Sequence, residues 1–394
     1  MTTARVFGSF DTICFGGGDW WYHNRAHMDV HMMRRLASRG KVLYVNSIVM
    51  TRPKLSSGRK FVGKVVRKAA SIFAGLKKTE EGLWIYSPFS LPVQHLNWMR
   101  PINEAMIGAQ LSYIRRRLGI SEPIVWVVCP TACNVALKMP KKRLIYQRTD
   151  RFEDYPDVDK DEIETFDRKL RDVSDITIYV NRALFEQEKS QCRKAIFLDH
   201  GVDVERFSRA LADPFVPPDI AEISGPIVGY FGAIDEHKID AGFIAALADL
   251  LPDVSFVFVG AGNMDCSELA KRKNVKLLGR KPYEEIPHYG KRFNAAMIPW
   301  RKNSWTQAAN PIKLKEYLAL GKPVVCTFAS TQLLEYKDVI SFADDVETFA
   351  SSIRKALTDD NAVLAAARKE KVKDASWESK TEAVIRELFS SEAI

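Results

Sequence analysis

Short apolar runs alternate with helical patterns along the whole chain, and this alternation limits the folds available to it. The runs lack a polar side, so both of their faces must be buried, which is typical of parallel strands covered by helices. We therefore predict an α/β fold built on parallel sheets. Strands are expected at residues 11–15, 41–46, 83–87, 123–128, 143–147, 176–180 and 195–198, then at 226–231, 254–259, 275–278, 295–299, 323–326 and 339–342.

The length of 394 residues is too great for one ordinary core. Residues 210–226 are rich in proline and small residues and are the natural linker. We predict two doubly wound, Rossmann-like domains at 1–208 and 209–372, and a helix at 373–394 that closes back toward the N-terminal domain. Ligands of such sheets bind beyond the carboxyl ends of the strands.

The segment 310–323 has the features of an anion-binding helix. Pro311 suits a first helical turn, so Asn310 is expected at or beside the N-cap. Free N–H groups there, with Lys313 one turn in, would bind a phosphate or diphosphate. Glu316 follows three residues later on a neighbouring surface and can accept hydrogen bonds from ribose hydroxyls. The same spacing also fits a capped amphipathic helix whose Lys and Glu are solvated.

This segment, Asn310-Pro-Ile-Lys-Leu-Lys-Glu-Tyr-Leu-Ala-Leu-Gly-Lys-Pro, resembles the donor-binding helix of GT-B glycosyltransferases in the GT4-like, glycosyl transferases group 1 superfamily. Flanking stretches resemble the same superfamily in order: Gly229-Tyr-Phe-Gly-Ala-Ile-Asp, Val257-Phe-Val-Gly-Ala-Gly, Val275-Lys-Leu-Leu-Gly-Arg and Ala296-Met-Ile-Pro-Trp, with Tyr146-Gln-Arg-Thr-Asp150 and His200-Gly-Val-Asp203 in the first half. The resemblance implies the GT-B fold, two domains facing across a cleft, and a nucleoside-diphosphate sugar as donor, with UDP as the family's usual carrier. The donor is a substrate, and neither a cofactor nor a metal is expected.

The resemblance also assigns roles to single residues. Glu316 would hold the ribose, Lys313 with the backbone near Asn310 and Pro311 would hold the diphosphate, and Gly232 would let the chain pass close to the donor. Arg280 and Lys281 follow a strand at the place where the superfamily flanks the nucleobase.

Two positions depart from the common pattern. Ala308 stands where many members have an acidic residue that binds the sugar, and Ala233 stands where many have a phosphate-neutralising Arg. Lys238 is a candidate replacement for that Arg. The departures leave the donor sugar and the stereochemical outcome open.

An inverting transfer needs a general base for the acceptor hydroxyl. Asp150, just after the strand at 143–147, is the first candidate, although a turn or N-cap role explains it equally well. Asp19, which follows three glycines and precedes Trp20-Trp21-Tyr22, is the second. His27 is the third, with a half-buried helix histidine as the plainer interpretation. A retaining enzyme would need no base, and Asp150 would then orient the substrate.

Residues 52–78 contain nine Lys or Arg and no acidic residue, which equals the net charge of +9 of the whole chain. Within them, residues 59–73 predict an amphipathic helix with one basic and one apolar face, typical of a helix lying on an anionic membrane. A solvated helix packed on its domain is the alternative, and a nucleic-acid surface fits less well because the aromatic residues are not interleaved for stacking.

No cofactor site is expected from the remaining motifs. Cys129 and Cys133 lack a second ligand pair nearby, and the acidic residues at 157, 159 and 161 are interpreted as charges at a helix N-terminus. Scattered cysteines, the lack of a secretory signal and the lack of a long apolar run predict a cytoplasmic protein. With the basic segment, this predicts peripheral association with the inner face of the plasma membrane.

Together these features predict a glycosyltransferase of the hexosyltransferase type, which moves a sugar from a nucleoside diphosphate to a polyprenyl-linked or glycan acceptor in polysaccharide biosynthesis. The choice of UDP as the nucleoside diphosphate follows from the family resemblance alone. No nucleic-acid partner is expected. Two alternatives remain: a nucleotide-sugar epimerase or hydrolase on the same fold, and a non-catalytic protein that has kept the fold. The missing acid and Arg at Ala308 and Ala233 favour the second alternative.

Overall fold

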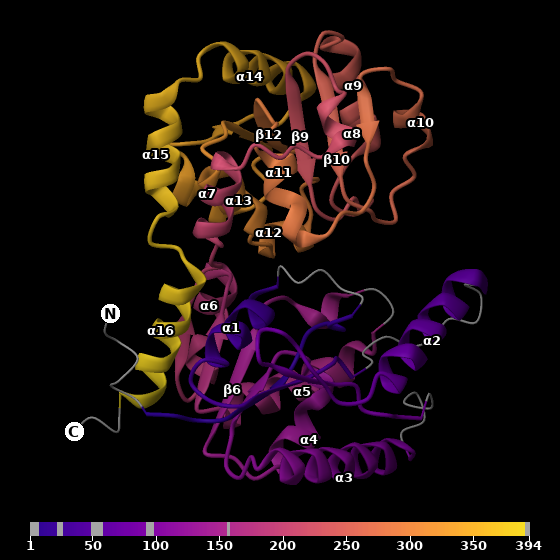
Figure 1. Ribbon diagram of the computed structural model, residues 1–394, viewed down its shortest axis with the longest axis vertical. Coiled ribbons are helices and arrows are strands. Elements are labelled where there is room, and N and C mark those ends of the chain that lie inside the picture. The colour runs from indigo at the N-terminus through magenta and orange to yellow at the C-terminus, as the bar shows by residue number, and fades with distance from the viewer. Residues whose placement is uncertain (1–7, 22–26, 49–57, 92–97, 156–157, 391–394) are drawn as a thin grey trace. The chain divides into compact units, whose positions relative to one another are not determined.

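The chain folds into two compact units, each with its own sheet (Figure 1). Unit 1 comprises Met1–Asp199 and Lys380–Ile394, and unit 2 comprises His200–Ser379. The chain passes from unit 1 to unit 2 between residues 199 and 200. The sequence analysis predicted this boundary nine residues later, between 208 and 209. The computed structural model describes residues 8–21, 27–48, 58–91, 98–155 and 158–390, with the backbone alone described at 58–65 and 308.

Unit 1 is built on an eight-stranded sheet with the order β3-β4-β2-β1-β5-β6-β7-β8 among the described residues. The strands are β1 Thr12–Phe15, β2 Val42–Val45, β3 Lys77–Lys78, β4 Trp84–Tyr86, β5 Ile124–Val127, β6 Arg143–Arg148, β7 Ile176–Tyr179 and β8 Ala195–Phe197. All neighbours run parallel except β3, which pairs with β4 in the antiparallel direction. Every strand predicted for this half is present. The two exposed lysines of β3 carry no apolar pattern, so the sequence did not reveal that strand.

Helices cover both faces of this sheet. They are α1 Met28–Leu36, α2 Gly58–Phe73, α3 Arg100–Leu118, α4 Cys133–Lys138, α5 Lys160–Val173, α6 Arg182–Glu188 and the later part of α16 Trp377–Phe389. Asp159 caps α5 by accepting a hydrogen bond from the Glu162 N–H, and Asp161 lies in its first turn. The acidic cluster therefore serves a helix N-terminus, as predicted, while position 157 lies outside the described residues.

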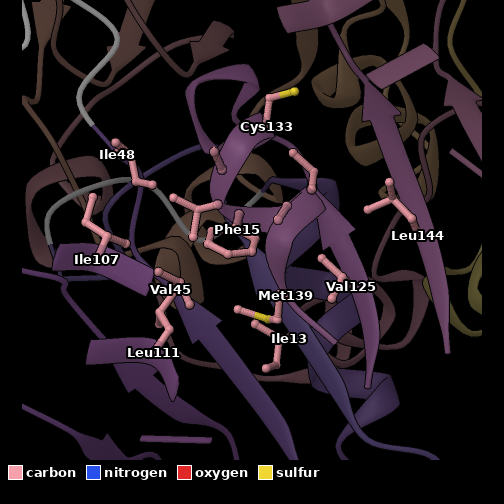
Figure 2. Packing of buried hydrophobic residues seen from close by; sticks show 14 of the residues in the cluster. Ile13, Phe15, Val45, Ile48, Ile107, Leu111, Val125, Cys133, Met139 and Leu144 are labelled. Atoms are coloured by element: carbon pink, nitrogen blue, oxygen red, sulfur yellow. The ribbon is translucent and has the colours of Figure 1, made fainter. Parts of the chain in front are cut away.

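The core of unit 1 forms where α3 and α4 pack on the middle strands. Figure 2 shows Phe15 of β1 within this cluster, with Val45 of β2, Val125 of β5 and Ile107 of α3 around it. These side chains are almost completely buried. Continuous apolar strands bury both faces in this way, and the polar loops after each strand are left at the carboxyl edge of the sheet.

Unit 2 repeats the scheme with a six-stranded parallel sheet in the order β11-β10-β9-β12-β13-β14 among its described residues. Each of the predicted strands is present, at β9 Ile227–Phe231, β10 Ser255–Val259, β11 Val275–Leu277, β12 Ala295–Ile298, β13 Val324–Cys326 and β14 Ser341–Phe342. The order grows outward from β9 in both directions, so the chain reverses its winding between β9 and β12. Loops diverge at such a point and leave a crevice for a ligand.

The helices of unit 2 are α7 Val204–Ala212, α8 Pro218–Ala221, α9 Ala241–Leu250, α10 Ser267–Ala270, α11 Ile286–Gly290, α12 Ser304–Ala308, α13 Ile312–Ala319, α14 Val346–Thr358 and α15 Ala362–Val372. The stretch 210–226, predicted as a linker, holds the end of α7 and all of α8 and belongs to unit 2. Pro218 lies in the first turn of α8, where a missing N–H costs nothing, so the proline-rich composition marked a short helix.

Candidate functional site

Helix α13 starts at the carboxyl edge of the unit 2 sheet and carries both charged residues predicted to bind a nucleotide. Its N-cap position is Pro311, so the helix begins at Ile312, one residue beyond the predicted start, and Asn310 precedes the cap. Leu314 and Leu318 are buried and hold the helix on the sheet. Lys313 therefore lies in the first turn, next to the N–H groups that have no partner within the helix.

The Lys313 amine lies between two aromatic residues from different strands. It donates a hydrogen bond to the Tyr230 hydroxyl of β9, and it lies 3.8 Å from the Tyr230 ring centroid and 5.7 Å from that of Trp300, which follows β12. Burial lowers the pKa of Lys313 well below its usual value, and the positive charge of Lys238 lowers it further. An anion bound here would favour the ammonium form, because an opposite charge raises the pKa of a buried amine.

Gly232 provides the space for this amine. Its φ is +121°, a conformation that L side chains rarely adopt, and a Cβ built on it would lie 2.8 Å from the Lys313 Nζ. The carbonyl of Gly232 is in turn covered by Gly260, where a Cβ would approach the oxygen to 1.9 Å. Close packing therefore requires Gly260, and the positive φ favours glycine at 232. The close approach of a donor to Gly232 stays a prediction.

Glu316, three residues after Lys313, is only 4% exposed and accepts a hydrogen bond of 3.1 Å from the Tyr283 hydroxyl. Burial raises the pKa of Glu316 to about 7, and the negative charge of Asp203 acts in the same direction. The Tyr283 hydrogen bond and Lys313 oppose this rise. A buried carboxylate with a single described donor has acceptor capacity left for the hydroxyl groups of a ligand.

A loop carrying Lys238 lies near this pair of residues. The Lys238 amine is 3.1 Å from Asp235 and 4.6 Å from the ring centroid of Trp305 on α12, and His237 meets the same ring edge-on at 5.1 Å. Lys238 is close enough to Lys313 to lower its pKa. Lys238 is therefore near Lys313, the residue predicted to bind phosphate, as a substitute for the missing Arg at Ala233 has to be.

The two basic residues expected beside the nucleobase differ in their surroundings. Arg280 is exposed on the loop after β11, whereas the Lys281 amine lies 2.6 Å from Asp219 of α8 and 5.5 Å from the Tyr289 ring centroid. Lys281 is thus held by α8. The residue of this loop that reaches α13 is Tyr283, through its bond to Glu316.

In unit 1 the glycine run after β1 has a packing explanation. A Cβ on Gly16 would lie 2.0 Å from the Tyr44 hydroxyl, so this position admits only glycine. That hydroxyl donates a hydrogen bond of 2.8 Å to Asp29, and the same carboxylate oxygen accepts one of 3.0 Å from the Gly17 N–H. The run is therefore built around Tyr44 and Asp29, and its sequence does not indicate a ligand.

Asp19, which follows this run, is 7% exposed and bound by its own unit. One carboxylate oxygen accepts a hydrogen bond from the Ser71 hydroxyl of α2 at 2.8 Å, and the other accepts one from the Trp21 N–H at 3.0 Å. Asn46 and Ser87 extend the same network across β2 and β4. With both oxygens occupied, Asp19 is well suited to joining α2 to the edge of the sheet and poorly suited to removing a proton.

Asp150 lies two residues beyond β6 at the carboxyl edge and is half-buried. Its Oδ2 accepts a hydrogen bond of 3.0 Å from the Tyr155 hydroxyl, and its carbonyl accepts one of 2.9 Å from Arg148. Arg148 is 1% exposed and forms ion pairs with Glu153, 2.8 Å away, and with Asp167, 3.1 Å away. A rigid, buried ion network therefore positions the turn that carries Asp150.

The three residues predicted as candidate bases do not share one local site. Strand β5 separates β1, before Asp19, from β6, before Asp150, a separation of about 10 Å across the sheet. His27 precedes α1 as its N-cap residue, makes no capping hydrogen bond and is exposed in unit 1. The interpretation of His27 as a half-buried helix residue is therefore wrong, because α1 begins only at Met28.

The basic segment forms α2, as its periodicity predicted, although residues 52–57 lie outside the described part of the chain. Val66 is 60% exposed and Phe73 is 89% exposed, so the described end of the helix presents apolar side chains to the surface. Lys68 departs from the predicted basic face, because its amine donates a hydrogen bond of 3.1 Å to the Ser47 carbonyl. Burial lowers the pKa of Lys68, while the charge of Asp19 opposes that change.

The sequence analysis did not predict several residues that surround Lys313 and Glu316. Tyr230 and Tyr283 contact Lys313 and Glu316 from elements far away in the chain. Tyr230 lies in an apolar strand and Tyr283 follows Lys281 and Pro282, so neither position indicated a site. Lys315, to which the sequence analysis assigned no role, is 2% exposed and donates a hydrogen bond to the His200 carbonyl. The His200-Gly-Val-Asp203 motif was the available signal, since it lies beside α13.

Comparison with known proteins finds similarity to glycosyltransferases over part of the chain. Residues 225–359 match the family model described as Glycosyl transferases group 1. A stretch of 156 residues is 30% identical to TuaH of Bacillus subtilis (strain 168), named as a teichuronic acid biosynthesis glycosyltransferase. That stretch covers 38% of this chain and 38% of TuaH, so the match spans well under half of the relative.

Solved structures match over almost the whole chain. Sucrose-phosphate synthase from Thermosynechococcus elongatus has a TM-score of 0.68 at 13% identity, and HepE of Anabaena in complex with UDP and glucose has a TM-score of 0.69 at 13% identity. Each match covers 97% of this chain and 100% of the other. At this identity the likeness establishes the fold. The chain has the GT-B fold, and residues 225–359 are similar to the glycosyl transferases group 1 family.

Proposed function

We propose that this protein is a glycosyltransferase that takes its sugar from a UDP-linked donor. The observation that carries the proposal is the placement of Lys313 and Glu316 on one helix at the reversal point of the unit 2 sheet, with Gly232 leaving room beside the lysine. This arrangement offers a cation and free N–H groups to a diphosphate and a buried carboxylate to a ribose. The UDP complexes of HepE, a protein of the same fold, support UDP as the carrier.

The proposed reaction is a sugar transfer to a hydroxyl group. The acceptor oxygen bonds to the anomeric carbon of the sugar, and the bond from that carbon to the diphosphate breaks. Lys313 and the α13 N-terminus stabilise the negative charge that develops on the leaving nucleoside diphosphate. If configuration inverts, Asp150 accepts the proton of the acceptor hydroxyl, and Tyr155 and Arg148 hold it in place. If configuration is retained, Asp150 orients the acceptor.

We further propose that the acceptor is a lipid-linked glycan and that unit 1 docks on an anionic membrane through residues 52–78. No described helix is long and apolar enough to cross a bilayer. The support is the absence of acidic residues in this segment and the exposure of Val66 and Phe73 on α2. At about 1 kcal/mol for each basic residue near the surface, these charges suffice for reversible docking. The named role of TuaH in teichuronic acid biosynthesis is consistent with a cell-wall polymer as the product.

The donor assignment is tested by incubating the purified protein with a panel of nucleotide sugars, with and without membrane lipid extract, and measuring the nucleotide released. Release that depends on lipid supports the transferase. Release without acceptor indicates a hydrolase, and the absence of nucleotide binding indicates a non-catalytic protein. Glu316→Ala should abolish measurable UDP binding by calorimetry, whereas Glu284→Ala, an exposed neighbour on the Tyr283 loop, should bind as the native protein does.

The membrane assignment is tested separately, by flotation with vesicles. Replacement of Arg59, Lys60, Lys64 and Arg67 by Gln removes basic residues of α2 and keeps Lys68, which bonds to the Ser47 carbonyl within unit 1. This variant should lose binding to vesicles that contain phosphatidylglycerol and keep its affinity for UDP. Unchanged flotation would exclude α2 as the docking element.

A further inference from the structure

Exposed apolar side chains of unit 1 gather in one part of the chain. Within its described residues, every large apolar side chain that is exposed lies between residues 66 and 113, with exposed fractions from 46% to 89%. They are Val66, Phe73, Phe89, Trp98, Ile102 and Tyr113. Exposed apolar residues that adjoin one another on a surface indicate a contact surface, so the placement of these residues in the fold matters.

Four of these six residues lie on or beside α3, which is apolar on two sides. Asn103, Ile107, Leu111 and Ile114 are buried against the sheet. On the outer side, residues 102, 105, 109 and 113 are Ile, Ala, Ala and Tyr, spaced three or four apart and all exposed. A surface helix normally turns polar residues away from its domain, yet α3 presents a second apolar stripe to the surface.

Helices α2 and α3 are joined along the chain through one edge of the unit 1 sheet. Helix α2 leads into β3, and β3 pairs with the neighbouring strand β4 at the sheet edge. The residues after β4 run along α3: Gln110 exchanges two hydrogen bonds of 2.9 Å with the backbone of Phe89, and Asn103 exchanges bonds of 2.9 and 3.1 Å with Leu91. Phe89 is therefore fixed beside the α3 stripe.

The positive charge of the chain lies in the same segment. Residues 52–119 contain thirteen Lys or Arg and three Asp or Glu, a net charge of +10, whereas the whole chain has +9. The rest of the chain thus sums to −1. Arg116 and Arg117 are exposed in the last turn of α3, at the end of the stripe that carries Tyr113. Cations beside exposed apolar residues complement a surface that is apolar inside and anionic outside, which is the interface of an anionic bilayer.

We propose that the outer face of α3, with Phe89 and Trp98, is a second lipid-contacting surface of unit 1, which rests on the same anionic bilayer as α2. The proposal rests on the membrane docking proposed above and extends it to an element that lies outside residues 52–78. Trp98 and Tyr113, 69% and 62% exposed, have the amphipathic rings that settle at the level of lipid headgroups. Two helices would fix the orientation of unit 1 on the membrane, which a single helix cannot do.

The test uses the full chain and flotation with vesicles of phosphatidylglycerol and phosphatidylcholine. Trp98→Glu combined with Tyr113→Glu should weaken vesicle binding about tenfold or more, because a charge replaces each interfacial ring. Val363→Glu, at a 78% exposed valine of unit 2, is the matched control and should bind as the native protein does. UDP affinity, measured alongside, should be unchanged in all three proteins, which separates this surface from the donor site.

Fluorescence quenching gives a second test, which works while the variant still binds vesicles. Brominated lipids should quench part of the native tryptophan fluorescence, and Trp98→Phe should remove that part while the protein still floats. Unchanged flotation of the double variant, or identical quenching in Trp98→Phe, would overturn the proposal. So would a native dimer that the double variant converts to monomer without altered vesicle binding, since the stripe would then be a protein interface. A native chain that binds UDP but no vesicles overturns both membrane proposals and leaves the donor site standing.

Discussion

Burial of the Glu316 carboxylate lowers the stability of the native protein, and urea unfolding can measure this loss. Its carboxyl group is 4% exposed, and burial raises its pKa from 4.5 to about 7. In the unfolded chain the group ionises near its ordinary value, so between pH 4.5 and 7 the native state binds more protons than the unfolded state. Stability therefore falls as the pH rises through this window, by about 3 kcal/mol in total at 1.36 kcal/mol per pKa unit.

Glu316→Gln removes this penalty and keeps the shape of the side chain. The amide oxygen can still accept the hydrogen bond from Tyr283. At pH 8 we expect the variant to be more stable than the native protein by up to about 3 kcal/mol, and near pH 4.5 we expect the two to be nearly equal. UDP affinity should nevertheless fall about 10- to 100-fold, because a charge-assisted hydrogen bond to the ribose contributes about 1.5–3 kcal/mol.

Urea unfolding followed by circular dichroism at pH 4.5 and pH 8 measures the first effect, and calorimetry with UDP measures the second. Glu284→Gln serves as the control, since this exposed residue should change neither quantity. A variant less stable than the native protein at pH 8 would refute the argument. A difference in stability between the variant and the native protein that is the same at both pH values would also refute it. Ionisation of the buried carboxyl predicts a difference that grows between pH 4.5 and pH 8.

Two further substitutions test the rest of the site. Gly232→Ala should cost about 1–3 kcal/mol of stability and weaken UDP binding, because its φ is +121° and the new Cβ would meet the Lys313 amine. Gly108→Ala on α3, where a Cβ has free space, is the control in thermal unfolding, and equal losses at both sites would contradict the steric argument. Asp150→Asn should lower kcat about 100-fold or more without changing donor KM if Asp150 is the base, and Tyr155→Phe should have a smaller effect. An unchanged kcat in Asp150→Asn would remove it from the mechanism.

The sequence alone was sufficient for the parallel sheets and for the charged pair on α13. Buried parallel strands need a continuous apolar run, so their positions appear directly in the residue pattern. Lys313 and Glu316 lie on one helix, and helical geometry places residues three apart on neighbouring surfaces whatever surrounds them. Local periodicity therefore predicted both, and the superfamily resemblance predicts a nucleotide as the ligand of such a pair.

The tertiary structure decided the partners of these residues. Tyr230 and Tyr283 reach α13 from strands and turns whose placement depends on how the sheet winds, and no spacing along the chain encodes that contact. The same holds for Asp19, which the sequence analysis named as the second candidate base and which accepts a hydrogen bond from Ser71 of α2. The exposed apolar stripe of α3 also could not be predicted from the sequence. An apolar residue looks the same in the sequence whether it faces the core or the surface, and only packing decides which side of a helix is covered.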